Sequence, residues 1–296
     1  MDFSGVIAYP VTPFTPDGDI NEVELKRLIE SLAVTGVDSI VVLGSSGSFA
    51  YLNRVERESI IRASVDAAFL VAPMLPVYAG VSAVGTREVL DHASDAERAG
   101  AKGLVLSTAS YVPLTAEEVA MQCRTVAQST TLPICLYNNP GTTQFDFPVE
   151  LVVELAALDN VVALKDPGAD GVVFRQRGET LKRMIGENFC HGMSGDAAIV
   201  ENGDPEIAWH AGAAALLPRM FVELRSSLIE GRAQDAADAR SKLQPVLRHL
   251  TEQRKLSGLH SLARACGWDA GDPRLPLLPV PGSQHRDMAR LVDQLV

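Results

Sequence analysis

Short apolar runs recur along the chain, and each is followed by a polar loop and an amphipathic stretch. Alternation of this kind is typical of parallel strands that helices cover on both faces. Apolar positions at helical spacing predict helices over residues 21–35 and 86–99, the second with Thr86 as its N-cap. The predicted strands cover residues 5–8, 39–43, 75–79, 103–106, 133–137, 161–164, 188–190 and 213–217.

Eight strand and helix units in succession predict an α/β fold, a (β/α)8 TIM barrel. A doubly wound open sheet is the alternative, but no GxGxxG motif follows the first predicted strand. Beyond residue 225 the helical spacing continues without strands between the helices. We therefore predict a catalytic barrel over residues 1–225 and a C-terminal helical extension over residues 226–296.

Polar residues gather after several of the predicted strands. Because barrel enzymes build their sites from the loops at the carboxyl ends of the strands, we expect these residues to surround one site. They are the Gly-Ser-Ser-Gly-Ser loop at 44–48, Ser110 and Tyr111, the Tyr-Asn-Asn-Pro sequence at 137–140, Lys165, and Gly195 with Asp196.

Lys165 ends an apolar run and is followed at once by Asp-Pro-Gly. A lysine desolvated in this way has a lowered pKa, and its free amine is a nucleophile toward carbonyls. Tyr137 ends the preceding predicted strand, where its phenol could transfer a proton. The alternatives are a lysine whose ammonium extends into solvent and a core tyrosine whose hydroxyl is hydrogen-bonded within the protein.

The loop at 44–48 has the composition of an anion-binding turn, because its backbone N–H groups and hydroxyls can point at a ligand. It lacks the Gly-Lys-Ser/Thr of a nucleotide phosphate loop. Opposite a reactive lysine it could hold a carboxylate, and a carboxylate beside a reactive carbonyl describes a 2-oxo acid. Asp196 either binds a substrate hydroxyl or caps a helix.

Composition excludes several other classes of function. A net charge of −11 argues against nucleic acid or an anionic membrane as a partner. The 4 cysteines form no CxxC pair and the 6 histidines are dispersed, so we expect neither a metal site nor disulfides. The first residues lack the order of a signal peptide and no apolar run is long enough to span a membrane, so we expect a soluble, cytoplasmic protein.

Taken together, the motifs resemble those of the dihydrodipicolinate synthase and N-acetylneuraminate lyase family of class I aldolases. The resemblance covers nearly the whole chain and depends on the order and spacing of its motifs. They are Val-Thr-Pro-Phe at 11–14, the segment 36–47, Tyr-Asn-Asn-Pro at 137–140, Ala-Leu-Lys-Asp at 163–166, Ser-Gly-Asp at 194–196 and Arg-Leu-Pro-Leu at 274–277.

This resemblance implies roles for individual residues. Lys165 would form an imine with the substrate, Tyr137 would transfer protons, and Ser45 would relay them. Tyr111 resembles the tyrosine that family members contribute to a neighbouring subunit, which implies a homodimer or a homotetramer. The implied substrate-binding residues are Ser46, Gly47, Thr142, Gly195, Asp196 and Leu216. Because the imine is covalent, no cofactor is expected.

Three positions depart from the family pattern. Ser48 replaces an acidic residue, and residues 214–218 are unusually apolar for the eighth strand. Thr142 stands where dihydrodipicolinate synthases have an arginine that meets the carboxylate of the aldehyde substrate. We therefore predict a lyase, an aldolase or dehydratase, that acts on pyruvate or a related 2-oxo acid through Lys165. One alternative is 4-hydroxy-tetrahydrodipicolinate (dihydrodipicolinate) synthase proper. Another is a catalytically degenerate barrel that only binds a 2-oxo acid.

Overall fold

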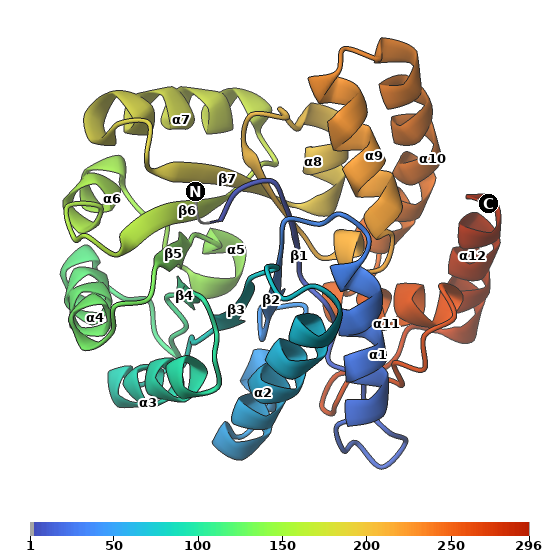
Figure 1. The fold of residues 1–296 in the computed structure, drawn as a ribbon, viewed down its shortest axis with the longest axis horizontal. Helices are drawn as coiled ribbons and strands as arrows, with labels where there is room; N and C mark the ends of the chain where they lie inside the picture. Colours follow the sequence, from blue (N-terminus) through green and yellow to red (C-terminus); the bar gives the residue numbers. More distant parts are fainter. Residues whose placement is uncertain (1–2, 296) are drawn as a thin grey trace.

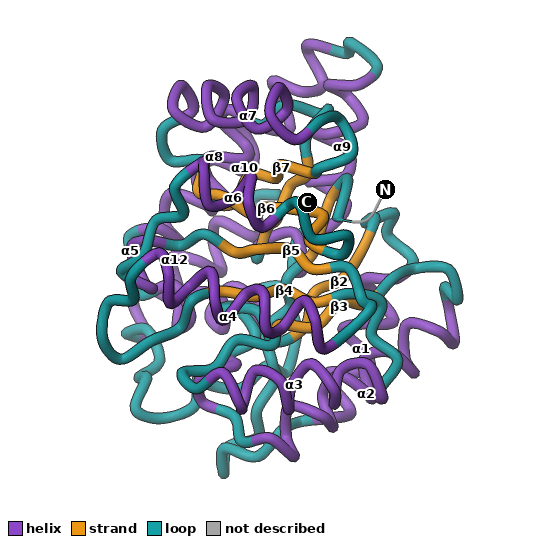
Figure 2. The backbone as a smooth tube through the Cα atoms, turned by 90° about the vertical axis from the view of Figure 1, so that its left-hand side faces the viewer, coloured by secondary structure: helices purple, strands orange, loops and turns teal. Residues whose placement is uncertain are grey.

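The barrel prediction is confirmed by a computed structural model that describes residues 3–295. Eight parallel strands close into a barrel in chain order, and the last pairs with the first. Figure 1 shows the helices arranged around the barrel, and Figure 2 shows the strands at its centre from the side. The strands are β1 (Val6–Ala8), β2 (Ser39–Val42), β3 (Val77–Gly80), β4 (Leu104–Ser107), β5 (Ile134–Tyr137), β6 (Val161–Pro167), β7 (Cys190–Ser194) and β8 (Ala208–Ala211).

Helices connect the strands and continue beyond the barrel. The barrel helices are α1 (Glu22–Ala33), α2 (Arg54–Val71), α3 (Thr86–Arg98), α4 (Ala116–Ser129), α5 (Pro140–Thr143), α6 (Val149–Leu155), α7 (Gly171–Ile185), α8 (Asp196–Asn202) and α9 (Pro218–Ile229), with short 3-10 turns η1 (Phe49–Tyr51) and η2 (Ala213–Ala215). The extension contains α10 (Ala233–Thr251), α11 (Lys255–Ala265) and α12 (Gly282–Asp293), which lie along one side of the barrel (Figure 1). The predicted division after residue 225 falls inside α9. Of the helices in the described part of the chain, none is long and apolar enough to cross a membrane.

Alternation along the strands divides the buried residues into two clusters. A smaller cluster fills the barrel interior and includes Tyr9, Tyr137 and Ala163. A larger cluster lies between the strands and the surrounding helices and includes Leu164, the neighbour of Ala163. Lys165 stands two residues after Ala163, so it shares the inward face of β6. The strand pattern therefore directs the lysine into the barrel.

The boundaries of β6 and β7 differ from the predicted ones. β6 does not end at Lys165 but continues to Pro167, which the strand tolerates at its last position. β7 runs from Cys190 to Ser194, where only Cys190 lies within the predicted strand. The strand was predicted at the wrong residues because its glycine and polar residues interrupt the apolar pattern.

The predicted strand at 213–217 is wrong. β8 is Ala208–Ala211, and the following Ala213–Ala215 form η2. The strand contains a tryptophan and a histidine, whereas the alanine run after it is more apolar but has a stronger preference for helical conformations.

Thr86 is not the N-cap of α3. Gly85 occupies that position without a side-chain bond, and the Thr86 hydroxyl instead lies 3.3 Å from Gln122 Nε2, which donates to it.

Candidate active site

Lys165 lies inside the mouth of the barrel, between two aromatic rings. Its side chain is 5% exposed. Its Nζ is 3.7 Å from the ring centroid of Tyr137 and 4.0 Å from that of Tyr9. Burial lowers the pKa of Lys165, because the charged form loses its hydration. This environment favours the neutral, nucleophilic amine.

Tyr137 is the last residue of β5 and pairs in register with Lys165 on β6. Burial by itself raises the pKa of the Tyr137 phenol, but the charge of the adjacent Lys165 lowers it. The charge of Lys255 and a hydrogen bond with Ser45 act in the same direction, and the resulting pKa lies below the ordinary value. A phenol with a lowered pKa beside an amine with a lowered pKa can exchange a proton with it.

Tyr9 and His210 are part of the same site, and the sequence reasoning missed both. The Tyr9 hydroxyl and His210 Nδ1 are 2.8 Å apart in a buried hydrogen bond. Burial raises the pKa of Tyr9 well above its usual value, and burial with the charge of Lys165 holds the pKa of His210 well below its usual value. Both groups are therefore uncharged near neutral pH. Tyr9 could have been predicted, because it stands two residues after Ile7 and so shares the inward face of the first strand. His210 could not, because the eighth strand was predicted at the wrong residues.

Gly192 makes room for His210 beside the lysine. It pairs with Lys165 in the register of β6 and β7. A Cβ atom at Gly192 would lie 2.4 Å from His210 Nε2. Only a residue without a side chain leaves this space, so Gly192 permits the imidazole to occupy the barrel interior.

The loop after β2 is a tight turn that presents hydroxyl groups to the mouth. Leu43 and Ser48, at its two ends, both have a φ of 58°. The Gly47 N–H donates to the Gly44 carbonyl at 3.0 Å, and the Gly47 carbonyl accepts from the buried Thr12 hydroxyl at 2.8 Å. These bonds hold the two serines between the glycines in place.

Ser46 and Asp196 come from opposite parts of the sequence and meet at the end of β8. Asp196 Oδ1 accepts a hydrogen bond from the Gly212 N–H at 2.7 Å. A Cβ atom at Gly212 would lie 2.9 Å from Ser46 Oγ and 3.6 Å from Asp196 Oδ2. Gly195, with a φ of 105°, is the N-cap of α8 and sets the direction of the following carboxylate. One oxygen of Asp196 thus accepts a backbone hydrogen bond, and the other lies on the same side of Gly212 as the Ser46 hydroxyl.

The remaining predicted site residues have no contact with Lys165 among those described above, and they lie in three different surroundings. Thr142, on α5, lines a cavity of about 680 Å³. Ser45 lines the same cavity and is hydrogen-bonded to Tyr137. Tyr111 follows β4 and is 90% exposed. Leu216 follows η2 and is 5% exposed within the outer hydrophobic cluster.

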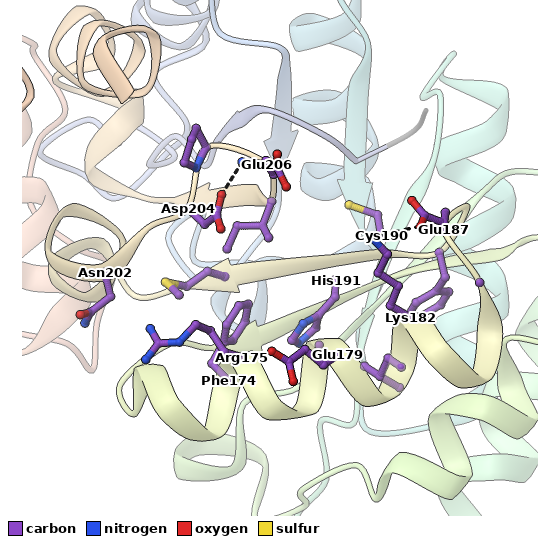
Figure 3. A pocket seen from close by; sticks show the side chains of 17 residues that line it. Phe174, Arg175, Glu179, Lys182, Glu187, Cys190, His191, Asn202, Asp204 and Glu206 are labelled. Atoms are coloured by element: carbon purple, nitrogen blue, oxygen red, sulfur yellow. Dashed lines mark hydrogen bonds and ion pairs between the residues drawn. The ribbon is translucent and has the colours of Figure 1, made fainter. Parts of the chain in front are cut away.

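A second cleft, of about 780 Å³, lies outside the barrel between α7, β7 and the segment at residues 202–207 that precedes β8 (Figure 3). In this view His191 lies beside Phe174 of α7, and their ring centroids are 4.2 Å apart. His191 Nε2 is 3.1 Å from Asp166 Oδ2, on the face of β6 opposite to Lys165. Although larger, this cleft is separated from the lysine by the barrel wall, so we place the candidate site at the mouth.

Among residues 3–295, no group of three or more His, Cys, Asp or Glu side chains is arranged to hold a metal ion. The ionisable groups around Lys165 include Tyr9 and Tyr137, whose rings it contacts, and His210, which is hydrogen-bonded to Tyr9. Such groups suit covalent and proton-transfer chemistry.

A parallel barrel with a buried lysine and tyrosine at its mouth defines a class of barrel lyases, and comparison with known proteins identifies the family. The chain matches the Dihydrodipicolinate synthetase family over residues 2–295, and it belongs to that family. It is therefore an enzyme, a lyase of this family that acts on small molecules.

Relatives and solved structures agree with this assignment. A protein of Salinibacter ruber named 4-hydroxy-tetrahydrodipicolinate synthase is 30% identical over 95% of this chain and 91% of its own length. The crystal structure of dihydrodipicolinate synthase from Agrobacterium tumefaciens is 31% identical, with a TM-score of 0.92 over 99% of this chain and 98% of that one. YagE, a prophage protein of this family from Escherichia coli, solved in complex with pyruvate, is 25% identical, with a TM-score of 0.90 over 100% of this chain and 99% of that one.

Proposed function

We propose that the protein binds pyruvate or a related 2-oxo acid as a Schiff base on Lys165, and then cleaves an aldol bond or eliminates water. The observation that carries this proposal is the burial of Lys165 Nζ between the rings of Tyr137 and Tyr9. A desolvated amine attacks carbonyl carbon readily because little free energy is needed to remove its proton. No separate cofactor is required, since the protonated imine itself withdraws electrons.

The first steps use groups already in contact. Lys165 Nζ forms a bond to the C2 carbon of the substrate, and the carbonyl oxygen takes a proton from Tyr137 to become a hydroxyl. The nitrogen then returns one proton to the Tyr137 phenolate. The phenol formed in this way donates that proton to the hydroxyl, which leaves as water as the C=N bond forms. Ser45, hydrogen-bonded to the phenol, passes the exchanged protons toward the mouth. The iminium then accepts the electron pair released when a bond at C3 breaks.

The turn after β2 is the proposed site for the substrate carboxylate. Backbone N–H groups and hydroxyls of Ser45, Ser46 and Gly47 would replace its hydration. Asp196 Oδ2, across the mouth, is the proposed acceptor for a substrate hydroxyl, with Gly195 holding the carboxylate in place. The pyruvate bound by YagE supports a 2-oxo acid as the ligand class.

Reductive trapping tests the proposed imine. Incubation with pyruvate and borohydride should add the mass of a reduced pyruvyl group to Lys165, located by peptide mass spectrometry. Lys165→Ala should lose the adduct, and Lys102→Ala, which removes an exposed lysine before β4, should keep it. An unmodified wild-type protein, or an equal adduct in Lys165→Ala, would refute the imine.

The second candidate function is 4-hydroxy-tetrahydrodipicolinate synthase proper, which the name of the Salinibacter ruber relative favours. Thr142 argues against it, because it supplies no positive charge for a second carboxylate, a contact worth about 1.5–3 kcal/mol when it is charge-assisted. A coupled assay with pyruvate and aspartate semialdehyde decides between them. A kcat/KM of about 10⁴–10⁸ M⁻¹s⁻¹, the ordinary range for enzymes, would establish the synthase.

We also propose that Tyr111 completes the site of a neighbouring subunit in a homodimer or homotetramer. Its exposed position after β4 supports this role, because its own chain leaves the side chain uncovered. The four cysteines are free, which supports a reducing compartment such as the cytoplasm.

A further inference from the structure

We propose that Lys255, the first residue of α11, recognises an anionic group at the far end of the substrate. The substrate class would then be a 2-oxo acid that carries a second carboxylate. This inference rests on the proposed function, since Lys165 must hold the 2-oxo end for Lys255 to meet the other end.

The packing of α11 against the barrel rim determines where Lys255 lies. Leu259 of α11 is fully buried, and its Cδ1 is 3.4 Å from the position of a Cβ atom at Gly212. Ser46 Oγ is 2.9 Å from that same position. Lys255 precedes Leu259 by one helical turn and so shares its face, and side chains on a helix lean toward its N-terminus. Lys255 therefore extends beyond this contact from the rim of the mouth.

The charge of Lys255 reaches the reactive groups. It lowers the pKa of both Tyr137 and Lys165. This effect agrees with the position at the rim of the mouth that the packing of α11 gives to Lys255. Lys255 itself is exposed, and within residues 3–295 it makes no ion pair. It is thus an uncompensated cation at the entrance of a site inside a protein of net charge −11.

Other cations near the mouth are already engaged. Arg54 and Arg57 line the cavity next to Ser45. Arg54 is paired with Asp95 at 2.6 Å, and Arg57 is buried with its two terminal nitrogens bonded to backbone carbonyls. Position 142, where the resemblance to dihydrodipicolinate synthases leads us to expect an arginine, is a neutral threonine here. A second substrate carboxylate would therefore find its counter-ion on α11.

The experiment compares matched 2-oxo acids with and without a terminal carboxylate. The pairs are 2-oxoglutarate with 2-oxopentanoate, and 2-oxoadipate with 2-oxohexanoate. Borohydride trapping, read as intact protein mass, gives the half-saturating concentration of each acid. In the wild type at least one dicarboxylate should saturate at about fivefold lower concentration than its partner, the factor an exposed ion pair supplies. Lys255→Gln should abolish this ratio, and Lys255→Arg should preserve it.

Two further comparisons separate recognition from general electrostatics. Removing the charge of Lys255 also alters the pKa of Lys165, but this affects both acids of a pair equally, so the ratio isolates recognition. Arg254→Gln removes the same charge from the adjacent N-cap residue, which has an extended backbone and lines a separate cavity with Pro276 and Leu278, and should keep the wild-type ratio. Circular dichroism checks that each variant is folded.

The outcomes distinguish the two proposals. Absence of a trapped adduct with every 2-oxo acid would overturn the imine and, with it, the role of Lys255. Adducts that form with equal half-saturation for both acids of each pair would overturn only the role of Lys255. An equal shift for both acids in Lys255→Gln would do the same, since the lysine would then act solely on the pKa of Lys165.

Discussion

Replacing Lys165 with methionine should make the folded protein more stable near neutral pH while it abolishes activity. The lysine is 5% exposed, and its ammonium contacts the faces of two aromatic rings. Each desolvated cation–π contact stabilises the folded protein by about 2 kcal/mol. Removing an ammonium from water destabilises it by several kcal/mol, even after the protein has relaxed. Methionine fills a similar volume without a charge, so we expect a gain of about 1–4 kcal/mol in the free energy of unfolding.

The pH dependence of this gain follows from the pKa of Lys165, which burial holds below the ordinary value of 10.5. At pH values between the pKa of Lys165 in the folded protein and its pKa in the unfolded chain, the unfolded chain carries one proton more than the folded protein. The stability of the wild type therefore rises with pH in that window, by up to about 1.36 kcal/mol per pH unit. The advantage of Lys165→Met should be greatest below the folded pKa and should disappear above the unfolded one.

Urea unfolding of both proteins from about pH 7 to pH 10, at one fixed protein concentration, measures this difference. Lys102→Met, at an exposed position, serves as the control and should change the free energy of unfolding by about 0.5 kcal/mol or less. A variant that is less stable than the wild type at neutral pH would refute the reasoning. The lysine would then form a stabilising buried ion pair with an ionised Tyr137.

Three other variants test the remaining parts of the site. Tyr137→Phe should lower kcat by about 10²- to 10⁴-fold with an unchanged fold, and an unchanged kcat would exclude the phenol from proton transfer. Tyr111→Phe should lower kcat by a similar factor, and mixing its subunits with Lys165→Ala subunits should restore activity. If subunits shown to exchange recover nothing, Tyr111 acts within its own chain or not at all. Gly192→Ala should reduce the free energy of unfolding by about 1–3 kcal/mol, because the new Cβ would lie 2.4 Å from His210 Nε2. Adding His210→Ala should recover part of that loss, and strictly additive losses would contradict the clash.

The features that the sequence predicted well depend on short-range periodicity. Strands with continuous apolar runs, such as β2 and β5, were placed within a residue or two because every position in them is buried. The proximity of Lys165 and Tyr137 followed from the same reasoning, since consecutive parallel strands are neighbours in a barrel and both residues end apolar runs. Where a strand carries polar or small inward residues, as β7 and β8 do, the apolar pattern fails and the strand is misplaced.

The same failure explains why His210 was not predicted as part of the site. An imidazole on an inward face interrupts the apolar run by which a strand is recognised, so residues that make the barrel interior polar also make their strands hard to find. The role of Gly192 could not be predicted either, because it consists of the space that a missing side chain leaves for His210 on the next strand. Lys255 belongs to the C-terminal extension, and its place beside the barrel mouth follows from the packing of Leu259 near Gly212, two residues that are far apart in the sequence. Sequence periodicity thus predicts the nucleophile and its nearest partner, whereas the groups that tune and surround them depend on how distant elements pack.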